Sequence, residues 1–336
     1  MKLTTELLSQ TVRSTVANVC QAVGVNEANH TESLQRICNV YSSSSCLPDP
    51  FAGVKTQYMQ QKHFTEHFGM VNPVLINLPE KSDAFGRVRT NQSQKIRKET
   101  YVTVPLISQL TILLNKNDVH RQVFGEKIHV PGVLSRFEDG SAFKDSIFFK
   151  DHPNAIQLHL YIDEVQITDP VGKKVFKNKM VFVYFTIGNL EPKYRSCLKH
   201  IHLLSIFPNR HVESYGLNFL LKPIVEEIKL LEDGVDMMIH GTMIKVYGTL
   251  AVLTADNLAS HTVGGFKAGF AKGFRKCRYC LAVDVDIQTK FCDRQFEART
   301  KTNHDLHCSG LATTLREYFG KLYGINGTSI LNELKQ

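Results

Sequence analysis

The sequence contains no tryptophan and only eight cysteines among its 336 residues. Eight cysteines are too few for a disulfide scaffold, and their paired spacing favours metal ligation in a reducing compartment. No apolar run is long enough to cross a bilayer, because the strongest one, at 180–188, has only the length of a strand. Glu6 and Arg13 interrupt the segment where a secretory signal would be continuously apolar. The sequence therefore predicts neither a membrane protein nor a signal peptide.

The charge balance is positive, with 40 lysines and arginines against 32 acidic residues and a net charge of +8. A positive balance favours polyanionic partners such as nucleic acids, although basic proteins without such partners are common. The Gly264-Gly265 pair lacks the spacing and the Lys-Ser/Thr of a phosphate-binding loop, so nucleotide binding of that kind is not predicted.

The first 150 residues carry no catalytic or cofactor motif, and we expect a mainly helical region that binds DNA or another partner, or that only packs. Apolar residues at helical spacing predict an amphipathic helix within 1–39. Serines and prolines at 42–50 predict a linker. Further helices are expected at about 53–68 and 104–115.

The pattern changes after Pro153, where β-rich segments begin. Strands are expected at 155–167, 180–188 and 200–208, followed by a helix that ends before Gly234, a hairpin that turns at His240-Gly241, and a strand at 249–256. Asp169 opens a predicted turn, DPVG, between the first two strands.

Three consecutive strands, a helix and a further strand are the order of an RNase H-like fold, in which the last strand returns beside the first. We therefore expect an α/β (α+β) core with a mixed sheet. This wiring would bring Asp163, within the first strand, close to Asp256, at the end of the fourth. Two converging carboxylates are a site for Mg²⁺ or Mn²⁺. Alternatively, either aspartate is a solvated strand end. Glu164 would point to the opposite face and is a weaker candidate.

A second cluster of donors lies downstream. Cys277 and Cys280 form a Cys-x2-Cys pair, and His304, His307 and Cys308 follow. Thiolate sulfur and imidazole nitrogen are the usual ligands of zinc, and four donors close a tetrahedral site. We take Cys277, Cys280 and His307 as the first three ligands and prefer His304 over Cys308 as the fourth. The alternative is a pair of free thiols with unrelated histidines.

Basic residues surround the Cys-x2-Cys pair. They are Lys267, Lys272, Arg275, Lys276 and Arg278. A zinc-binding segment with a cationic surface, close behind a strand-end carboxylate, favours nucleic-acid chemistry.

Several segments, taken in order, resemble a known family. They are TIGNLEPKYRSCLKHIHLLSI, YGLNFLLKPIVEEIKLLEDGV, LTADNLASHTVGGF, FRKCRYCLAVD, and the later ART and HDLHC. They resemble transposon-derived proteins of animal genomes that are similar to the EnSpm/CACTA group of cut-and-paste transposases. The resemblance covers roughly 50–336 and is densest from about 155 to 308.

The resemblance implies a DDE-type enzyme that cuts DNA at element ends and joins the 3′-hydroxyls to target DNA with two divalent ions. It implies that Asp163 and Asp256 are the first two catalytic acids. It also implies a catalytic core over 151–265 and a zinc-binding insertion over 266–310. By analogy, a nuclear protein that acts as a homodimer is expected.

The third acid is where the chain departs from the family pattern. In the family it is a glutamate downstream of a Met-His-Asp stretch, which this chain does not contain. Glu317 and Glu333 lack that context and are expected on solvated helix faces. We therefore expect 311–336 to begin a C-terminal helical segment of an incomplete core, with little strand transfer. Two alternatives are a domesticated zinc-containing nucleic-acid-binding protein without catalysis, and a protein-interaction domain in which zinc is only a structural staple.

Overall fold

A computed structural model describes residues 54–79, 99–127, 130–167, 179–268 and 273–335. Contacts divide the chain into two units, Met1–Met70 and Val71–Gln336. The helix predicted within 1–39, the linker at 42–50 and the turn at Asp169 lie outside the described residues.

In the first unit, α3 (Gln57–Phe68) confirms the helix predicted at 53–68. Its first turn is capped by Thr56, whose side chain accepts a hydrogen bond from the Met59 amide, and it ends at Gly69 in the left-handed conformation.

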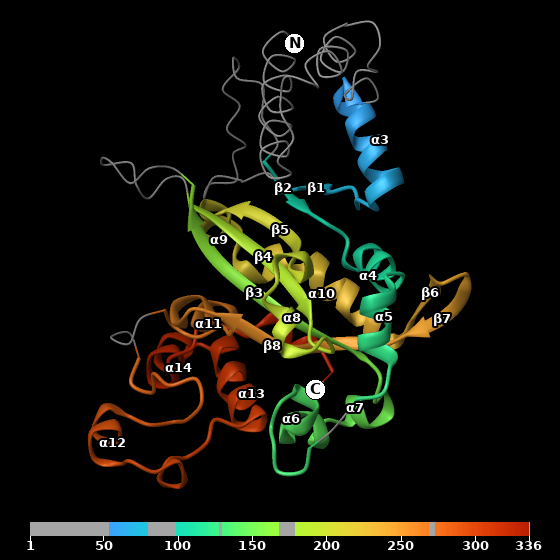
Figure 1. Ribbon diagram of the computed structural model, residues 1–336. Helices are drawn as coiled ribbons and strands as arrows, with labels where there is room; N and C mark the ends of the chain where they lie inside the picture. Colours follow the sequence, from blue (N-terminus) through green and yellow to red (C-terminus); the bar gives the residue numbers. More distant parts are fainter. Residues whose placement is uncertain (1–53, 80–98, 128–129, 168–178, 269–272, 336) are drawn as a thin grey trace, which may run out of the picture. The chain divides into compact units, whose positions relative to one another are not determined.

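The second unit is built on a six-stranded mixed sheet (Figure 1). Its strands, in spatial order, are β1 (Val74–Asn77), β2 (Thr100–Thr103), β5 (His202–Pro208), β4 (Lys179–Ile187), β3 (Ile156–Gln166) and β8 (Gly248–Ala255). The pair β3–β8 is parallel and the other pairs are antiparallel. The predicted mixed α/β architecture is therefore confirmed.

The predicted strand wiring is also present. Strands β3, β4 and β5 form an antiparallel meander, and β8 returns to lie parallel to β3. Parallel neighbours require a crossover, and α10 (Leu217–Asp233) lies within this connection, as predicted. A separate hairpin, β6 (Val235–Ile239) and β7 (Thr242–Val246), lies between α10 and β8.

The hairpin turns where the sequence predicted. His240 and Gly241 both have positive φ, at 48° and 78°. Two central residues of this conformation form the mirror-image turn whose twist matches that of the strands on either side.

The region before residue 150 differs from its prediction. Strands β1 and β2 were not predicted, and they extend the sheet beyond β5. The helices α4 (Leu106–Leu114), which was predicted, and α5 (Asn117–Phe124) bury their apolar side chains in the main core. Residues 71–150 therefore share one unit with the sheet rather than forming a separate helical region.

The main core lies between the sheet and α10. Six helix side chains are almost fully buried: Leu220, Leu221, Ile224, Val225, Ile228 and Leu231. They belong to the same cluster as Leu158, Leu160 and Ile162 of β3. Each such side chain stabilises the fold by about 1.5–3 kcal/mol. In Figure 1, α9 (Asn209–Tyr215) and α10 lie behind the sheet.

The opposite face of the sheet is covered at one end by a small aromatic cluster. Phe148 and Phe149 of α7 (Ile147–Asp151) are buried there, and Phe143 of α6 (Ser141–Asp145) packs against them. The start of β3 therefore lies between two apolar layers, which fits its run of buried residues from Ile156 to Leu160.

Short helices follow β8. They are α11 (Asn257–Val263), α12 (Asp284–Thr289), α13 (Lys301–Ser309) and α14 (Arg316–Tyr323), with a 3-10 turn at Ile330–Glu333. Among the described residues, no helix combines the length and the apolar character needed to cross a membrane.

Candidate functional site

Asp163 and Asp256 occupy corresponding positions on neighbouring strands. In the parallel register of β3 and β8, Ile162 lies opposite Ala255, and this is the last pair. Each aspartate is the next residue along its strand direction, and both are exposed. The crossover therefore brings the two predicted acids to the same edge of the sheet.

The two acids also begin on the same face. Ile162 is buried in the main core, and Ala255 packs against that core. Successive residues of a strand point to opposite faces of the sheet. The side chains of Asp163 and Asp256, which follow Ile162 and Ala255, therefore leave their strands on the face away from α10. Glu164 is an exposed member of an ion pair with Lys179 of β4, in line with its weaker candidacy.

Asp256 also has a structural role. It is the N-cap of α11, where its Oδ1 accepts a hydrogen bond from the Ala259 amide at 2.6 Å. The cap holds one carboxylate oxygen and fixes the side chain, and the second oxygen remains for a ligand. A strand-end cap and a metal ligand are therefore compatible roles for this residue.

The donor set fits magnesium or manganese but is small. Mg²⁺ is commonly held by one or two carboxylates, with waters and substrate phosphates completing its shell. Asp163 and Asp256 supply that minimum. In the described part of the chain, no group of three or more His, Cys, Asp or Glu side chains is arranged to hold a metal ion.

The two glutamates considered for the third acid are engaged elsewhere. Glu317 pairs with Lys321 within α14 at 3.0 Å. Glu333 forms an ion pair with Lys229 of α10. Both are exposed, as expected for solvated helix faces.

Two tyrosines lie in the row next to the acids. Tyr161 of β3 pairs directly with Tyr184 of β4, and their rings are parallel within 2° at a centroid distance of 5.2 Å. Burial raises the pKa of Tyr184, and the nearby charge of Asp163 raises it further. Sequence analysis missed this pair, although Tyr161 stands two positions before Asp163 and therefore on the same face.

One basic residue reaches the start of α11. Arg278 donates a hydrogen bond from Nη1 to Oδ1 of Asn257, the residue after Asp256. This contact ties the segment around Cys277 to the edge of the sheet that carries the acids. His261 is buried in the same helix, and its Nδ1 lies 3.2 Å from the Lys267 carbonyl oxygen.

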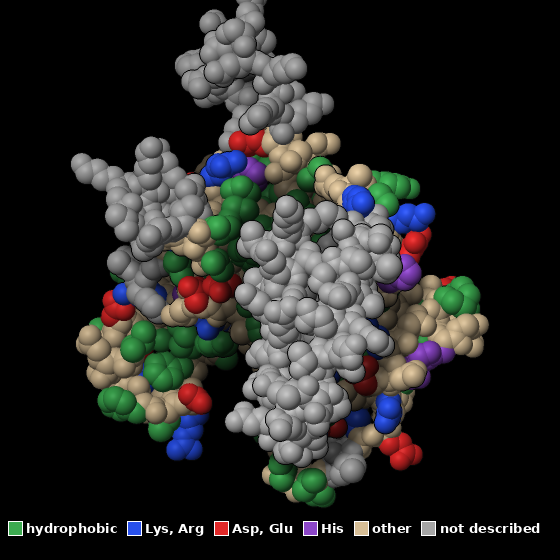
Figure 2. Space-filling model, turned by 45° about the horizontal axis from the view of Figure 1, so that its top comes forward, with side chains coloured by type: hydrophobic (Ala, Val, Ile, Leu, Met, Phe, Trp, Pro, Cys, Tyr) green, Lys and Arg blue, Asp and Glu red, His purple; other side chains and the backbone are tan. Residues whose placement is uncertain are grey.

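The other basic residues near the Cys-x2-Cys pair are largely used within the fold. Arg275 donates to the Leu281 carbonyl, and Lys276 pairs with Asp284. Lys272 lies outside the described residues. On the face drawn in Figure 2, lysines and arginines are scattered among acidic, apolar and uncharged side chains. The predicted cationic stripe is therefore represented near the acids mainly by Arg278.

Cys277 and Cys280 lie together, and their thiols interact. Burial raises the pKa of the Cys277 thiol, but hydrogen bonds from the Tyr279 and Cys280 amides outweigh it, so the net pKa is lowered. The Tyr279 amide lies 3.3 Å from the Cys277 sulfur. The pKa of Cys280 is raised, first by burial. A thiol with a lowered pKa is the better metal ligand.

The remaining donors lie on α13. His304 Nε2 lies 3.5 Å from the sulfur of Cys308, one helical turn away. His307 instead stacks on Tyr323, with ring centroids 3.5 Å apart. Both histidines are buried, and neither Nδ1 has a hydrogen-bond partner.

Arg299 lies among these donors. Its guanidinium donates to the carbonyl oxygens of Cys277 and Tyr323, both at 3.1 Å. Its charge also acts on Cys280 and Cys308. The candidate zinc donors thus form two pairs, Cys277–Cys280 and His304–Cys308, around a cation, whereas His307, one of the three ligands taken first from the sequence, lies against Tyr323. They do not form a single group of metal-binding geometry.

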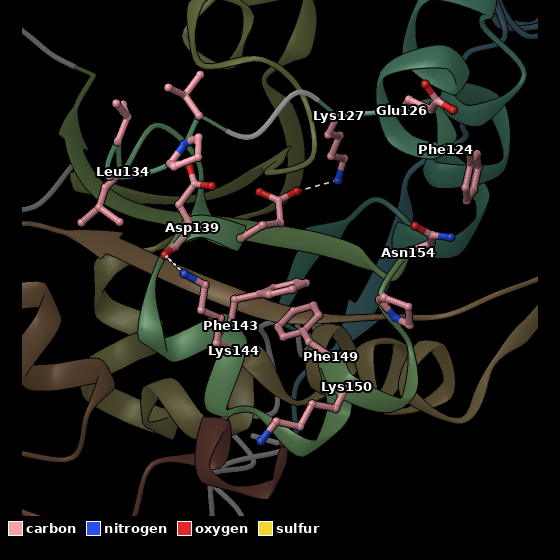
Figure 3. A pocket seen from close by; sticks show the side chains of 17 residues that line it. Phe124, Glu126, Lys127, Leu134, Asp139, Phe143, Lys144, Phe149, Lys150 and Asn154 are labelled. Atoms are coloured by element: carbon pink, nitrogen blue, oxygen red, sulfur yellow. Dashed lines mark hydrogen bonds and ion pairs between the residues drawn. The ribbon is translucent and has the colours of Figure 1, made fainter.

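A pocket of about 1000 Å³ opens elsewhere in the unit, beside α5, α6 and α7 (Figure 3). Phe143 and Phe149, stacked at 4.6 Å, lie on one side, and the ion pair between Lys127 and Glu138 lies on another, with a distance of 2.5 Å. Nothing in the sequence pattern indicated it.

No protein-family model matches this chain, and no curated protein is significantly similar to it.

Proposed function

We propose that this chain derives from a DDE-type transposase of the EnSpm/CACTA kind and that residues 151–265 supply its RNase H-like core. The observation that carries the proposal is the parallel pairing of β3 with β8, whose last paired residues, Ile162 and Ala255, immediately precede Asp163 and Asp256. Acids at this edge of such a sheet are suited to hold a divalent cation against a DNA phosphate.

The connectivity supports this proposal independently of the resemblance. A meander of three strands, a crossover that contains a helix, and a fourth strand parallel to the first are the elements that the fold requires, and the same elements occur here in order.

Asp163 and Asp256 would hold Mg²⁺ or Mn²⁺. When bound, such an ion neutralises phosphate charge and activates an oxygen nucleophile. The chain's own contribution is positional: the hydrogen bond from Ala259 fixes the carboxylate of Asp256, and Arg278 is held beside it through Asn257. Arg278 would contribute a guanidinium close to the phosphate.

Only two of the three acids of a DDE triad have candidates at this edge among the described residues. We therefore propose metal-dependent DNA binding with weak nicking rather than full strand transfer. A domesticated nucleic-acid-binding protein without catalysis is one alternative. The scattered lysines and arginines in Figure 2 favour the other alternative, a protein-interaction domain in which zinc is only a structural staple. A purely structural protein-interaction role would need neither Asp163 nor Arg278.

Zinc binding by residues 266–310 is a second part of the proposal. The interacting thiols of Cys277 and Cys280, and the contact of 3.5 Å between His304 Nε2 and the Cys308 sulfur, support it. To share one ion, the pairs would have to close on each other, and the lowered pKa of Cys277 would favour its thiolate.

The deciding experiment is a DNA assay with the full chain in Mn²⁺. Supercoiled plasmid reports nicking, and a labelled duplex reports binding. The proposal expects Mn²⁺-dependent nicking or binding by the wild-type protein that Asp163→Asn abolishes. Binding that needs no metal and is unchanged in Asp163→Asn would instead identify the domesticated binding protein. If the protein binds no DNA in any condition, the protein-interaction domain is the one hypothesis that remains.

A further inference from the structure

The sheet face next to the acids carries a stacked aromatic pair, formed by Tyr161 and Tyr184. The two rings are parallel within 2° with their centroids 5.2 Å apart, and both side chains are half-buried. The exposed Thr254 of β8 lies opposite Tyr161 in the same row. Phe182, which is also half-buried, lies opposite Asp163 in the next row.

The spacing between this surface and the acids suits one nucleotide. Tyr161 and Asp163 are two residues apart on one strand face, which separates them by about 7 Å. Aromatic side chains stack on the faces of unpaired bases without regard to sequence. A phosphate bound next to Asp163 and Asp256 would therefore leave its adjoining base beside the tyrosine pair, where it could extend the stack.

The charge of the face argues for the same occupant. Asp163 is exposed, so without a cation it would repel a phosphate from this edge. A divalent ion on the two acids reverses that repulsion, whereas the neutral tyrosine rings bind the base with or without the ion. A single-stranded DNA end supplies both complementary groups at the required separation.

Resting on the proposed function, we propose that Tyr161 and Tyr184 are positioning residues that stack on the unpaired base next to the phosphate held at Asp163 and Asp256. The pair would seat a DNA end with no preference for its sequence. This assigns the aromatic face to substrate binding rather than to packing alone.

The test measures binding of a short, labelled single-stranded oligonucleotide to the full chain in Ca²⁺, by fluorescence anisotropy. The variants are Tyr184→Phe, which keeps the aromatic face, and Tyr184→Leu, which keeps only apolar bulk. Tyr318→Leu, an exposed tyrosine on α14, is the matched control. We expect Tyr184→Leu to weaken binding about tenfold, the loss of one base stack, and Tyr184→Phe and Tyr318→Leu to bind as the wild type does.

An oligonucleotide with one abasic position separates stacking from a structural effect. The wild-type protein should bind it about tenfold more weakly than the intact strand, and Tyr184→Leu should no longer distinguish the two. Equal discrimination by wild type and Tyr184→Leu would overturn the proposal. Because the chain has no tryptophan, quenching of tyrosine emission on binding gives a second readout.

Asp163→Asn separates this proposal from the proposed function. If Asp163→Asn loses Ca²⁺-dependent binding while Tyr184→Leu binds normally, the stacking role is wrong and the metal-dependent function stands. If Asp163→Asn binds as the wild type does while Tyr184→Leu is weakened, the face binds bases but the acids do not hold the metal.

Discussion

Ile162 of β3 lies opposite Ala255 of β8 in a parallel register, and the next residue on each strand is an aspartate. The connection between these strands contains α10 and a hairpin, so two residues more than ninety positions apart become neighbours. The proposed metal site depends on this pairing. The proposed surface of the two acids, the tyrosine pair and Arg278 requires it.

Asp256 allows its structural and functional roles to be separated. Asp256→Ala removes the cap of α11 and should lower the free energy of unfolding by about 1 kcal/mol. Asp256→Asn keeps an oxygen that can accept from the Ala259 amide, so its stability should stay close to that of the wild type. Both variants should lose the stabilisation that saturating Mn²⁺ gives the wild type. Urea denaturation with and without Mn²⁺ measures both effects. Undiminished Mn²⁺ stabilisation in Asp256→Asn would count against a metal role for this residue.

Arg278 should contribute to DNA affinity through a phosphate contact. Arg278→Gln is expected to weaken binding uniformly across sequences and to lower the slope of log affinity against log salt by about one. Lys222→Gln is the matched control, because Lys222 is an exposed residue of α10, on the other side of the sheet. Titrations at several salt concentrations measure the slopes. Identical slopes for Arg278→Gln and the wild type would remove Arg278 from the DNA surface.

The zinc ligands can be assigned by metal analysis of purified variants. If zinc binds, the wild-type protein should contain about one equivalent, and Cys277→Ser with Cys280→Ser should lose it. Because His304 faces Cys308 while His307 stacks on Tyr323, Cys308→Ser should also lose zinc. His307→Phe keeps the stack and should retain the metal. Loss of zinc in His307→Phe, with retention in Cys308→Ser, would restore the ligand set preferred from the sequence.

His159 should make stability depend on pH. Burial, followed by the charge of Arg195, lowers the pKa of its imidazole to about 4 against the opposing charge of Glu138. The unfolded chain, with an ordinary pKa of 6.5, therefore binds more protons between these values. The contribution of His159 to the free energy of unfolding is fully present above pH 6.5 and is lost as the pH falls toward 4. Between pH 7 and pH 5 the loss from this residue is about 2 kcal/mol.

Other histidines contribute to the same pH dependence of stability. Burial lowers the pKa of His202 to about 4 as well, so this residue adds a similar loss. The pKa values of His200, His304 and His307 are also lowered, first by burial, and these residues add to the decrease. His159→Gln should therefore make the decrease in unfolding free energy between pH 7 and pH 5 smaller by about 2 kcal/mol without abolishing it. Denaturant titrations at the two pH values measure it. A decrease of the same size in His159→Gln and the wild type would mean that His159 is not the titrating group.

The sequence predicted the central part of the sheet well because its signals are strong there. Strands β3, β4 and β5 are long and rich in β-branched and aromatic residues, and α10 has an apolar stripe that ends at Gly234. Strands β1 and β2 have only four residues each, which is too few for an alternating pattern to be recognised. Their membership in the sheet depends on tertiary pairing with β5.

The candidate sites, like the fold, could be predicted only in part from the sequence. Strand wiring was enough to predict that the segments carrying Asp163 and Asp256 lie on neighbouring parallel strands, because parallel adjacency follows from the order of elements. The arrangement of the zinc donors did not follow from spacing. Nothing in the sequence indicated that the Arg299 guanidinium would lie among the thiols, or that His307 would stack on Tyr323.

Site-directed cleavage of the chain by bound iron tests the shared metal site most directly. Fe²⁺ replaces Mg²⁺ at carboxylate sites and, with ascorbate and peroxide, cuts the backbone next to where it binds. If Asp163 and Asp256 share a metal ion, cleavage should give two sets of fragments, with ends near residues 163 and 256, that disappear together on addition of excess Mg²⁺ and in Asp163→Asn. Cleavage near only one aspartate, or at neither, would contradict a metal ion shared by the two strands.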